Sequence, residues 1–204
     1  MAGVNSQGNM QLPIRQLKLR EMVASRCIQG VYYFDLCTGH ESFFWPYVQN
    51  SIGEAVCLLW CHLFGSKSDD LHFTKFFEDA EVNQFGGQYQ VDAVRSRLLM
   101  SAGFDQTDYL KFWEEVKLCR DKFVAHRDVD DQTVIFPRID QCRVMSEELR
   151  DILSECIDEW AKVSNDPKIV SMQDYYRWHP NRAMKDECKK QFKFGIQSVY
   201  SGLS

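Results

Sequence analysis

The sequence is poor in the two residues that most often interrupt helices, since its 204 residues include only 11 glycines and 5 prolines. This scarcity favours long helices over an architecture of many turns and short strands. No apolar run approaches the roughly 20 residues that a membrane-spanning helix needs. The net charge of -5 argues against broad electrostatic attraction to nucleic acid, although a local basic patch is compatible with it.

Two further patterns are missing from the chain. The polar residues at the start show neither the basic nor the apolar part of a secretion signal, so we expect a mobile N-terminus over residues 1–12. The eight cysteines form no dense framework, which favours reduced thiols and a cytoplasmic location. Hydrophobic residues make up 45% of the chain, enough for the core of a soluble globular protein.

Apolar residues recur at helical spacing along most of the chain. They predict helices over residues 14–36, 41–65, 71–77, 91–103, 105–127, 146–163 and about 182–200. Pro46 and Gly65 suit the first turn and the end of the second helix. Ser146 is expected to cap the helix that it precedes, because acidic residues follow it directly.

The other segments are expected to be irregular. Residues 82–90 are expected to form a loop, and residues 128–140 an acidic and then extended stretch in which Pro137 excludes helix. We therefore predict an all-α fold, an up-and-down bundle of five or six helices. The bundle is expected over residues 13–163, followed by a C-terminal extension over 164–204.

Basic residues and a histidine gather in "KLCRDKFVAHRD", residues 117–128, at the expected end of a helix. From Lys117 to Arg127 there are four basic side chains and one acidic one, opposite to the balance of the whole chain. Asp121 directly follows Arg120, and His126 comes five residues later. An arginine this close to a histidine arises often by accident, so the spacing alone identifies no function.

In its context the stretch resembles the signature of HEPN domains, in which an arginine and a polar residue precede a histidine by four to six residues. Arg120, Asp121 and His126 match that pattern. Residues 58–77, "LLWCHLFGSKSDDLHFTKFF", are similar to the abortive-infection branch of the family, where an "LF" pair precedes a polar turn and a short apolar helix. The resemblance covers residues 14–163.

The resemblance implies an all-α bundle that usually dimerises. Many family members are metal-independent endoribonucleases, toxins or antiphage effectors, whereas others have lost activity and act as binding partners. It therefore implies an RNA substrate, no cofactor, and an antitoxin or a nucleotidyltransferase as a possible partner. Some family toxins carry a tyrosine two residues after the histidine as the target of that transferase, but here the position is Asp128.

The chemistry of RNA cleavage explains why these residue types matter. The 2′-hydroxyl is an internal nucleophile, so cleavage needs a base, an acid and a group that holds charge on the phosphate. Histidine suits proton transfer near neutral pH, and the planar fork of arginine suits phosphate oxygens. We expect Arg120 and His126 to be catalytic and Asp121 to orient one of them. The cations that would contact flanking phosphates are Lys117, Lys122 and Arg127.

Helix geometry predicts how this site is assembled. At about 100° per residue, Arg120 and His126 would lie about 120° apart around an ideal helix, so one copy makes a poor pocket. Two copies related by a two-fold axis would bring two of each into one cleft, which predicts a homodimer. The alternative is a plain helix end, because basic residues in a last turn favour the helix dipole without any function.

Other candidate sites have simpler interpretations. Cys57, Cys61 and His62 suggest a metal site, but they lie in an apolar stretch without a second ligand pair, so core thiols are favoured and no metal is expected. Asp69 and His72 are expected to cap the short helix that follows them. Lys189, Lys190 and Lys193, with Phe192 and Phe194 between and after them, suit either base stacking or, preferably, an amphipathic helix with solvated charges.

Overall fold

The computed structural model describes residues 11–40, 44–121, 136–163, 167–178 and 181–201, and the regular structure in these segments is helical throughout. The longer helices are α1 (Gln11–Cys37), α2 (Phe44–Phe64), α5 (Val91–Ser101), α6 (Gln106–Arg120), α7 (Ile139–Val163), α8 (Pro167–Trp178) and α9 (Asn181–Ser201). Between α2 and α5 lie α3 (Phe73–Phe77), α4 (Ala80–Asn83) and a 3-10 turn at Gly87–Tyr89. The all-α class is confirmed, but five or six helices was too low a number.

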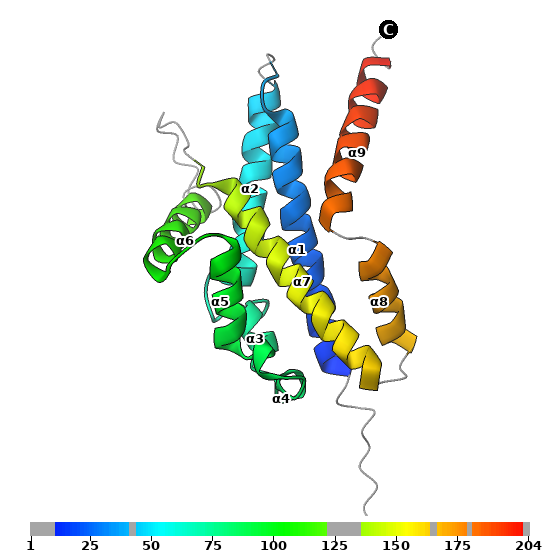
Figure 1. The fold of residues 1–204 in the computed structure, drawn as a ribbon. Helices are drawn as coiled ribbons and strands as arrows, with labels where there is room; N and C mark the ends of the chain where they lie inside the picture. The colour runs from blue at the N-terminus through cyan, green and yellow to red at the C-terminus, as the bar shows by residue number, and fades with distance from the viewer. Residues whose placement is uncertain (1–10, 41–43, 122–135, 164–166, 179–180, 202–204) are drawn as a thin grey trace, which may run out of the picture.

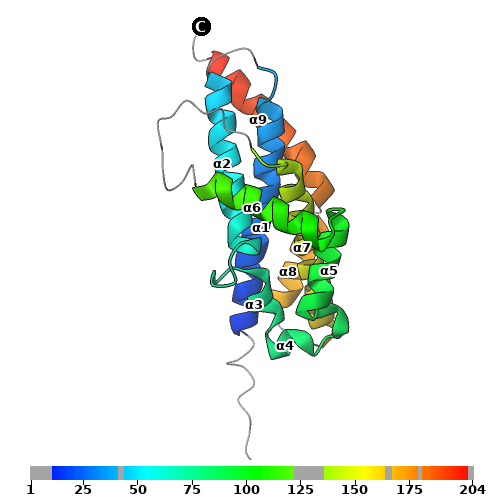
Figure 2. The same cartoon turned by 90° about the vertical axis from the view of Figure 1, so that its left-hand side faces the viewer.

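The centre of the fold is an antiparallel hairpin of α1 and α2, which α7 crosses diagonally (Figure 1). α5 packs against α7, and α6 packs against α2. The perpendicular view shows α6 lying across the α1 and α2 pair (Figure 2). α8 and α9 return along the other side of the molecule, where α8 packs on α7 and α9 on α1 (Figure 1).

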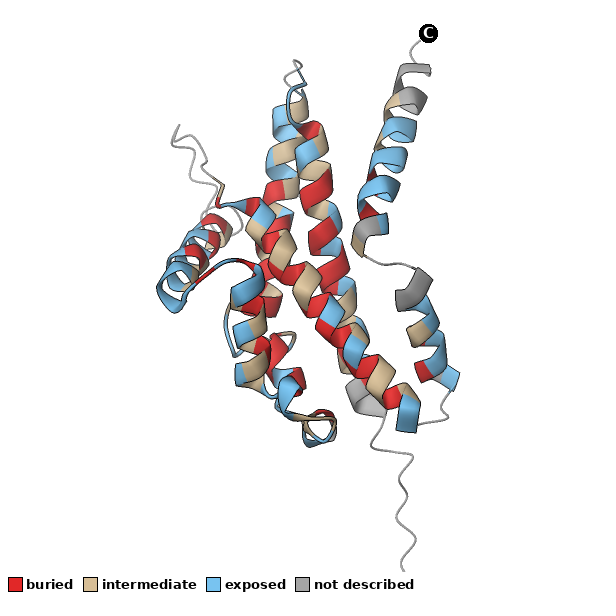
Figure 3. Ribbon diagram, viewed as in Figure 1, coloured by how far each residue is buried: buried red, intermediate tan, exposed pale blue. Residues whose placement is uncertain are grey.

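Burial follows the apolar stripes of the central helices. Buried residues line the facing sides of α1, α2 and α7, whereas α9 is largely exposed (Figure 3). Trp60 of α2 is fully buried, and its ring centroid lies 5.3 Å from that of Phe112 in α6. The hairpin is tight at Gly30, where a Cβ atom would lie 2.6 Å from Val56 Cγ2. Glycine therefore allows a close approach of α1 and α2 that alanine would disturb.

The boundaries of α2 agree with the sequence. Pro46 is the third residue of the helix and lies in its first turn, where a missing N–H is tolerated. The helix ends at Phe64, and the N–H of Gly65 donates to the carbonyl of Cys61 at 2.9 Å. Both predictions are confirmed.

The predicted start of α7 is wrong. α7 begins at Ile139, and Ser146 is fully buried inside it instead of capping its first turn. Three residues ahead of Ser146, namely Ile139, Cys142 and Met145, are buried and continue the apolar stripe about two turns upstream. This burial outweighs the capping preference of serine. The extended stretch was expected to reach residue 140, but it ends before Ile139, where α7 begins two residues after Pro137.

Two other expectations need correction. Residues 82–90, expected to be a loop, include the end of α4 and the 3-10 turn at Gly87–Tyr89. The predicted terminal helix is present as α9, but α8 was not predicted. Ile169 and Met172 of α8 join the main core, and Met184 and Cys188 of α9 pack against Ile28 and Tyr32 of α1. The described parts of the C-terminal extension thus pack on the bundle.

Two predicted segments fall partly or wholly beyond what the structure covers. Residues 1–10 and 122–135 lie outside the described residues. The mobile N-terminus therefore remains a prediction for residues 1–10, whereas Gln11 and Leu12, also predicted to be mobile, belong to α1. Within the described segments, no helix has both the length and the apolar composition that crossing a membrane would require.

Candidate functional site

The C-terminal end of α6 carries the described part of the arginine and histidine motif. Asp105 caps the start of the helix, because its Oδ1 accepts a hydrogen bond from the N–H of Asp108 at 2.8 Å. Phe112, Val116 and Cys119 face the core. The side chains of Lys117 and Arg120, one turn apart, therefore lie on the side of α6 that faces away from the core.

The guanidinium of Arg120 is held by the next residue. Its Nε and Nη2 both donate to Oδ1 of Asp121, at 2.8 and 2.6 Å. The side chain of Arg120 is 28% exposed and that of Asp121 is 49% exposed, so solvent reaches both partners. Burial alone would lower the pKa of Arg120, but Asp121 and the Cys61 thiol raise it above its usual value. The arginine is therefore a permanent cation in a fixed orientation.

Lys117 is placed by an aromatic ring. Its Nζ lies 5.1 Å from the ring centroid of Trp113, and Trp113 Nε1 donates to the carbonyl oxygen of Gly65 at 3.1 Å. The ring that carries the lysine is thus anchored to the end of α2. Two cations, Lys117 and Arg120, share this end of α6, and the helix dipole favours both whether or not they bind a ligand.

The structure brings together three of the six predicted site residues. Lys117, Arg120 and Asp121 meet at the end of α6, whereas Lys122, His126 and Arg127 lie outside the described residues. Asp128 lies outside them too. The angle between Arg120 and His126, which assumed a continuous ideal helix, remains an expectation.

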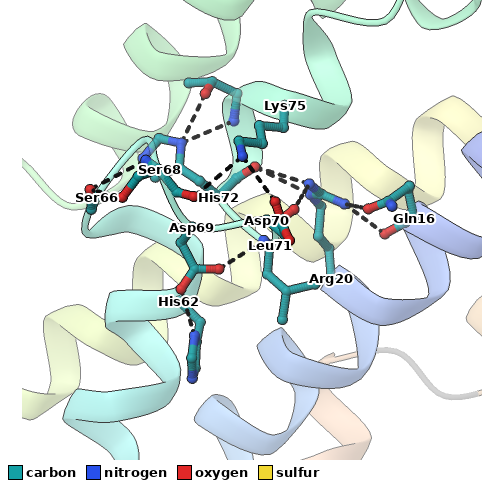
Figure 4. A network of polar contacts seen from close by, with 11 residues as sticks. Gln16, Arg20, His62, Ser66, Ser68, Asp69, Asp70, Leu71, His72 and Lys75 are labelled. Atoms are coloured by element: carbon teal, nitrogen blue, oxygen red, sulfur yellow. Dashed lines mark hydrogen bonds and ion pairs between the residues drawn. The ribbon is translucent and has the colours of Figure 1, made fainter.

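A second polar cluster connects α1 to the turn between α2 and α3 (Figure 4). Arg20 is only 1% exposed, and its Nη2 donates to the carbonyl oxygens of Asp70 and His72 at 2.8 and 3.1 Å. Its Nη1 donates to the backbone and side-chain oxygens of Gln16. Sequence reasoning missed this arginine, although a basic residue at a position of the α1 apolar stripe was a signal.

Two histidines contact the same turn, His62 from the last turn of α2 and His72 from the start of α3 (Figure 4). His72 caps α3, since its Nδ1 accepts a hydrogen bond from the N–H of Thr74 at 3.3 Å, which confirms the cap predicted for His72. Asp69, the other predicted cap, contacts the turn ahead of α3 instead. Desolvation, with the nearby charges of Lys67 and Arg20, lowers the pKa of His72 to about 4. His62 Nδ1 lies 2.7 Å from Oδ2 of Asp69, whose Oδ1 accepts from the N–H of Leu71. These contacts order the turn.

The cysteines near His62 face the core. Cys57 and Cys61 are buried, and burial raises the pKa of the Cys61 thiol to about 11, with Arg120 opposing the shift. His62 points instead to Asp69. Across the described segments, no three or more His, Cys, Asp or Glu side chains are arranged to hold a metal ion.

Two open grooves lie away from the motif. One, of about 430 Å³, runs between α1 and α2 and is lined mainly by apolar side chains such as Tyr33, Ile52 and Leu59. The other, of about 550 Å³, lies between the 3-10 turn, α7 and α8, and it carries Glu155 and Glu159. The second groove has the wrong charge for a phosphate, and neither is lined by Lys117 or Arg120.

The two phenylalanines of the tail differ in their surroundings. The ring of Phe192 packs against that of Trp45, with centroids 5.4 Å apart, whereas Phe194 is 73% exposed. The neighbouring lysines at positions 189, 190 and 193 are also exposed. One aromatic residue thus stabilises the helix contact, as an amphipathic helix requires.

Comparison with known proteins adds no family assignment for this chain. No family model matches it, and neither the curated proteins nor the solved structures contain a significant match.

Proposed function

We propose that this protein is a metal-independent endoribonuclease of the HEPN type, acting in the cytoplasm in antiphage defence or in a toxin and antitoxin pair. The observation that supports the proposal best is the placement of Arg120. Its guanidinium is oriented by Asp121 at the solvent-accessible end of α6, one turn from Lys117 and six residues before His126. A fixed, permanently charged fork is what a scissile phosphate requires.

In this proposal the phosphate oxygens bind Arg120, and His126 moves protons between the 2′-hydroxyl and the leaving 5′-oxygen. Asp121 is a positioning residue, because it holds the guanidinium without touching the phosphate. Lys117, Lys122 and Arg127 bind the flanking phosphates, which concentrates positive charge locally on an acidic chain. The reaction leaves a cyclic phosphate, because the nucleophile belongs to the RNA itself.

The working unit in the proposal is a homodimer. Two copies of the α6 end, related by a two-fold axis, supply two arginines and two histidines to one cleft. A regulator such as an antitoxin would act by covering that cleft. Transfer of a nucleotide to the residue two places after the histidine is not part of the proposal, because Asp128 lacks the tyrosine hydroxyl.

A second candidate function is a catalytically inactive module of the same fold that acts by binding a protein or nucleotide partner. The observation in its favour is the same ion pair. Both donating nitrogens of Arg120 use one oxygen of Asp121 within the chain, so the pair also serves as an ordinary structural contact at a helix end.

Cleavage of a mixed RNA pool in EDTA distinguishes the two functions. We expect the wild-type protein to cut, and we expect His126→Gln and Arg120→Lys each to lose about 100-fold or more of the rate. Lys111→Ala is the matched control, because it removes an exposed cation from α6 outside the motif and should leave the rate unchanged.

Circular dichroism and thermal unfolding check that each variant folds. Equal rates for the wild type and the two motif variants would overturn the proposal. A folded wild-type protein that cuts no RNA, as a dimer and free of other proteins, would support the binding module instead.

A further inference from the structure

Cysteine thiols from four helices converge in the core beneath the end of α6. They belong to Cys27 of α1, Cys57 and Cys61 of α2, Cys119 of α6 and Cys142 of α7, and each is at most 5% exposed. The Cys142 thiol lies within electrostatic range of Cys27, Cys61 and Cys119. Such crowding places several oxidisable groups around one point of the fold.

Two of these thiols are in direct contact. The Sγ atoms of Cys57 and Cys119 lie 3.4 Å apart, although the residues are 62 positions apart in the sequence. A disulfide needs a sulfur separation of about 2.04 Å, so the two atoms have to approach by only about 1.4 Å. α2 and α6 pack against each other here, so we expect side-chain rotation with a small shift of the end of α6 to cover that distance.

The contact also makes the two thiols unequal. Cys57 donates its S–H toward the sulfur of Cys119. This hydrogen bond lowers the pKa of the Cys119 thiol, and together with burial it raises that of Cys57. Thiolate is the reactive form of cysteine, so Cys119 is the better nucleophile of the pair. Cys119 is also closer to solvent, because it is 4% exposed whereas Cys57 is fully buried.

We infer that Cys57 and Cys119 form an oxidisable pair, which hydrogen peroxide converts into an intrachain disulfide joining α2 to α6. The Cys119 sulfur attacks one peroxide oxygen and breaks the O–O bond. The departing hydroxide takes the proton that Cys119 released, giving water and a sulfenic acid at Cys119. Cys57 then attacks that sulfur, and the expelled hydroxide takes the Cys57 proton to form the second water. Two thiols are oxidised and one peroxide is reduced.

The crosslink acts on the end of α6. Cys119 directly precedes Arg120, and the Arg120 guanidinium interacts with the thiol of Cys61, one turn from Cys57. Pulling Cys119 toward α2 therefore shifts the end of α6, which carries both Arg120 and Asp121. This consequence rests on the proposed function, whereas formation of the disulfide does not.

The test uses the full-length protein, reduced and then treated with hydrogen peroxide. Free thiols are blocked under denaturing conditions, and mass spectrometry of the proteolytic peptides locates any crosslink. We expect one disulfide between Cys57 and Cys119, two thiols fewer to block, and a melting temperature higher by about 5 to 10 °C. Cys57→Ser and Cys119→Ser should abolish the crosslink, and Cys188→Ser, a buried thiol on α9, should not.

Several outcomes would overturn the inference: a crosslink between other cysteines, oxidation of Cys119 to a sulfinic acid without a crosslink, or two thiols that stay reduced. The peptide map of the wild-type protein decides this even if a variant fails to fold. RNA cleavage by the reduced and crosslinked forms then tests the effect on Arg120, and we expect a loss of at least tenfold on oxidation. An unchanged rate would remove the regulatory role, and a wild-type protein that cuts no RNA would leave the disulfide result intact.

Discussion

Replacing Arg20 with methionine should destabilise the protein by about 2 kcal/mol, and two opposing effects set this magnitude. The Asp70 and His72 carbonyl oxygens lose the guanidinium donor. An acceptor left without its donor costs about 1 to 3 kcal/mol. The carbonyl oxygen of His72 keeps a second donor, the N–H of Lys75 at 3.1 Å. Losing the Arg20 hydrogen bond to this oxygen should therefore cost a free energy at the lower end of that range.

The opposing effect is the release of a buried charge. Burial lowers the pKa of Arg20 to about 10, so the charged form is held at some cost, and methionine removes that cost while filling a similar volume. We expect the lost hydrogen bonds to dominate, because the turn that carries both carbonyls has to stay closed around α3. Arg20→Lys keeps the buried charge but loses the fork, and it should destabilise at least as much as methionine.

Urea unfolding followed by circular dichroism measures the effect as a shift in midpoint at constant slope. Arg15→Met is the matched control, an exposed position on the same helix, and it should stay within about 0.5 kcal/mol of wild type. An Arg20→Met variant as stable as wild type would show that the network in Figure 4 does not stabilise the fold.

Two further predictions concern neighbouring parts of the fold. The pKa of His72 is lowered to about 4 in the folded chain, whereas a histidine in the unfolded chain has a pKa of about 6.5. Between these two pH values the unfolded chain binds a proton that the folded chain does not. The contribution of His72 to the free energy of unfolding therefore falls as the pH drops from about 6.5 to about 4. The stability difference between wild type and His72→Gln, measured by urea unfolding, should therefore shrink toward pH 4.5, and parallel pH profiles would contradict this. Gly30→Ala should lower the melting temperature in a thermal scan, because the new Cβ would lie 2.6 Å from Val56 Cγ2. Gly195→Ala in α9 should raise the melting temperature, because the new Cβ meets no packing neighbour within 4 Å and alanine has the higher helix propensity. A change of the same sign in both glycine variants would contradict the close packing of α1 on α2.

The sequence predicted the helices whose signals are local. The limits of α2 were predictable because Pro46 and Gly65 act on their own backbone. The apolar spacing of the tail is less regular, and it predicted the terminal helix α9 only in approximate bounds. The start of α7 was not, since a serine before two glutamates suggested a cap, while the buried stripe through Cys142 carried the helix further upstream. α8 had a usable signal in Pro167, which occupies its first position.

The sites divide in the same way. Asp121 pairs with Arg120, a neighbour in sequence, so this contact was open to sequence reasoning. The contact of Arg20 with Asp70 spans 50 residues, and that of Cys57 with Cys119 spans 62. Such pairs depend on how α1, α2 and α6 pack, which a residue pattern within one helix does not specify. The buried arginine and the thiol pair therefore emerge only from the three-dimensional structure.

The most direct test of the ribonuclease proposal is the chemistry of the cut. An RNA oligonucleotide that the protein cleaves in EDTA is compared with the same oligonucleotide carrying a single 2′-deoxy substitution at the cleaved position. The proposal predicts a 2′,3′-cyclic phosphate and a 5′-hydroxyl on the RNA products, and no cut at the substituted position. Cleavage of the substituted strand at an equal rate, or products with a 5′-phosphate, would contradict it.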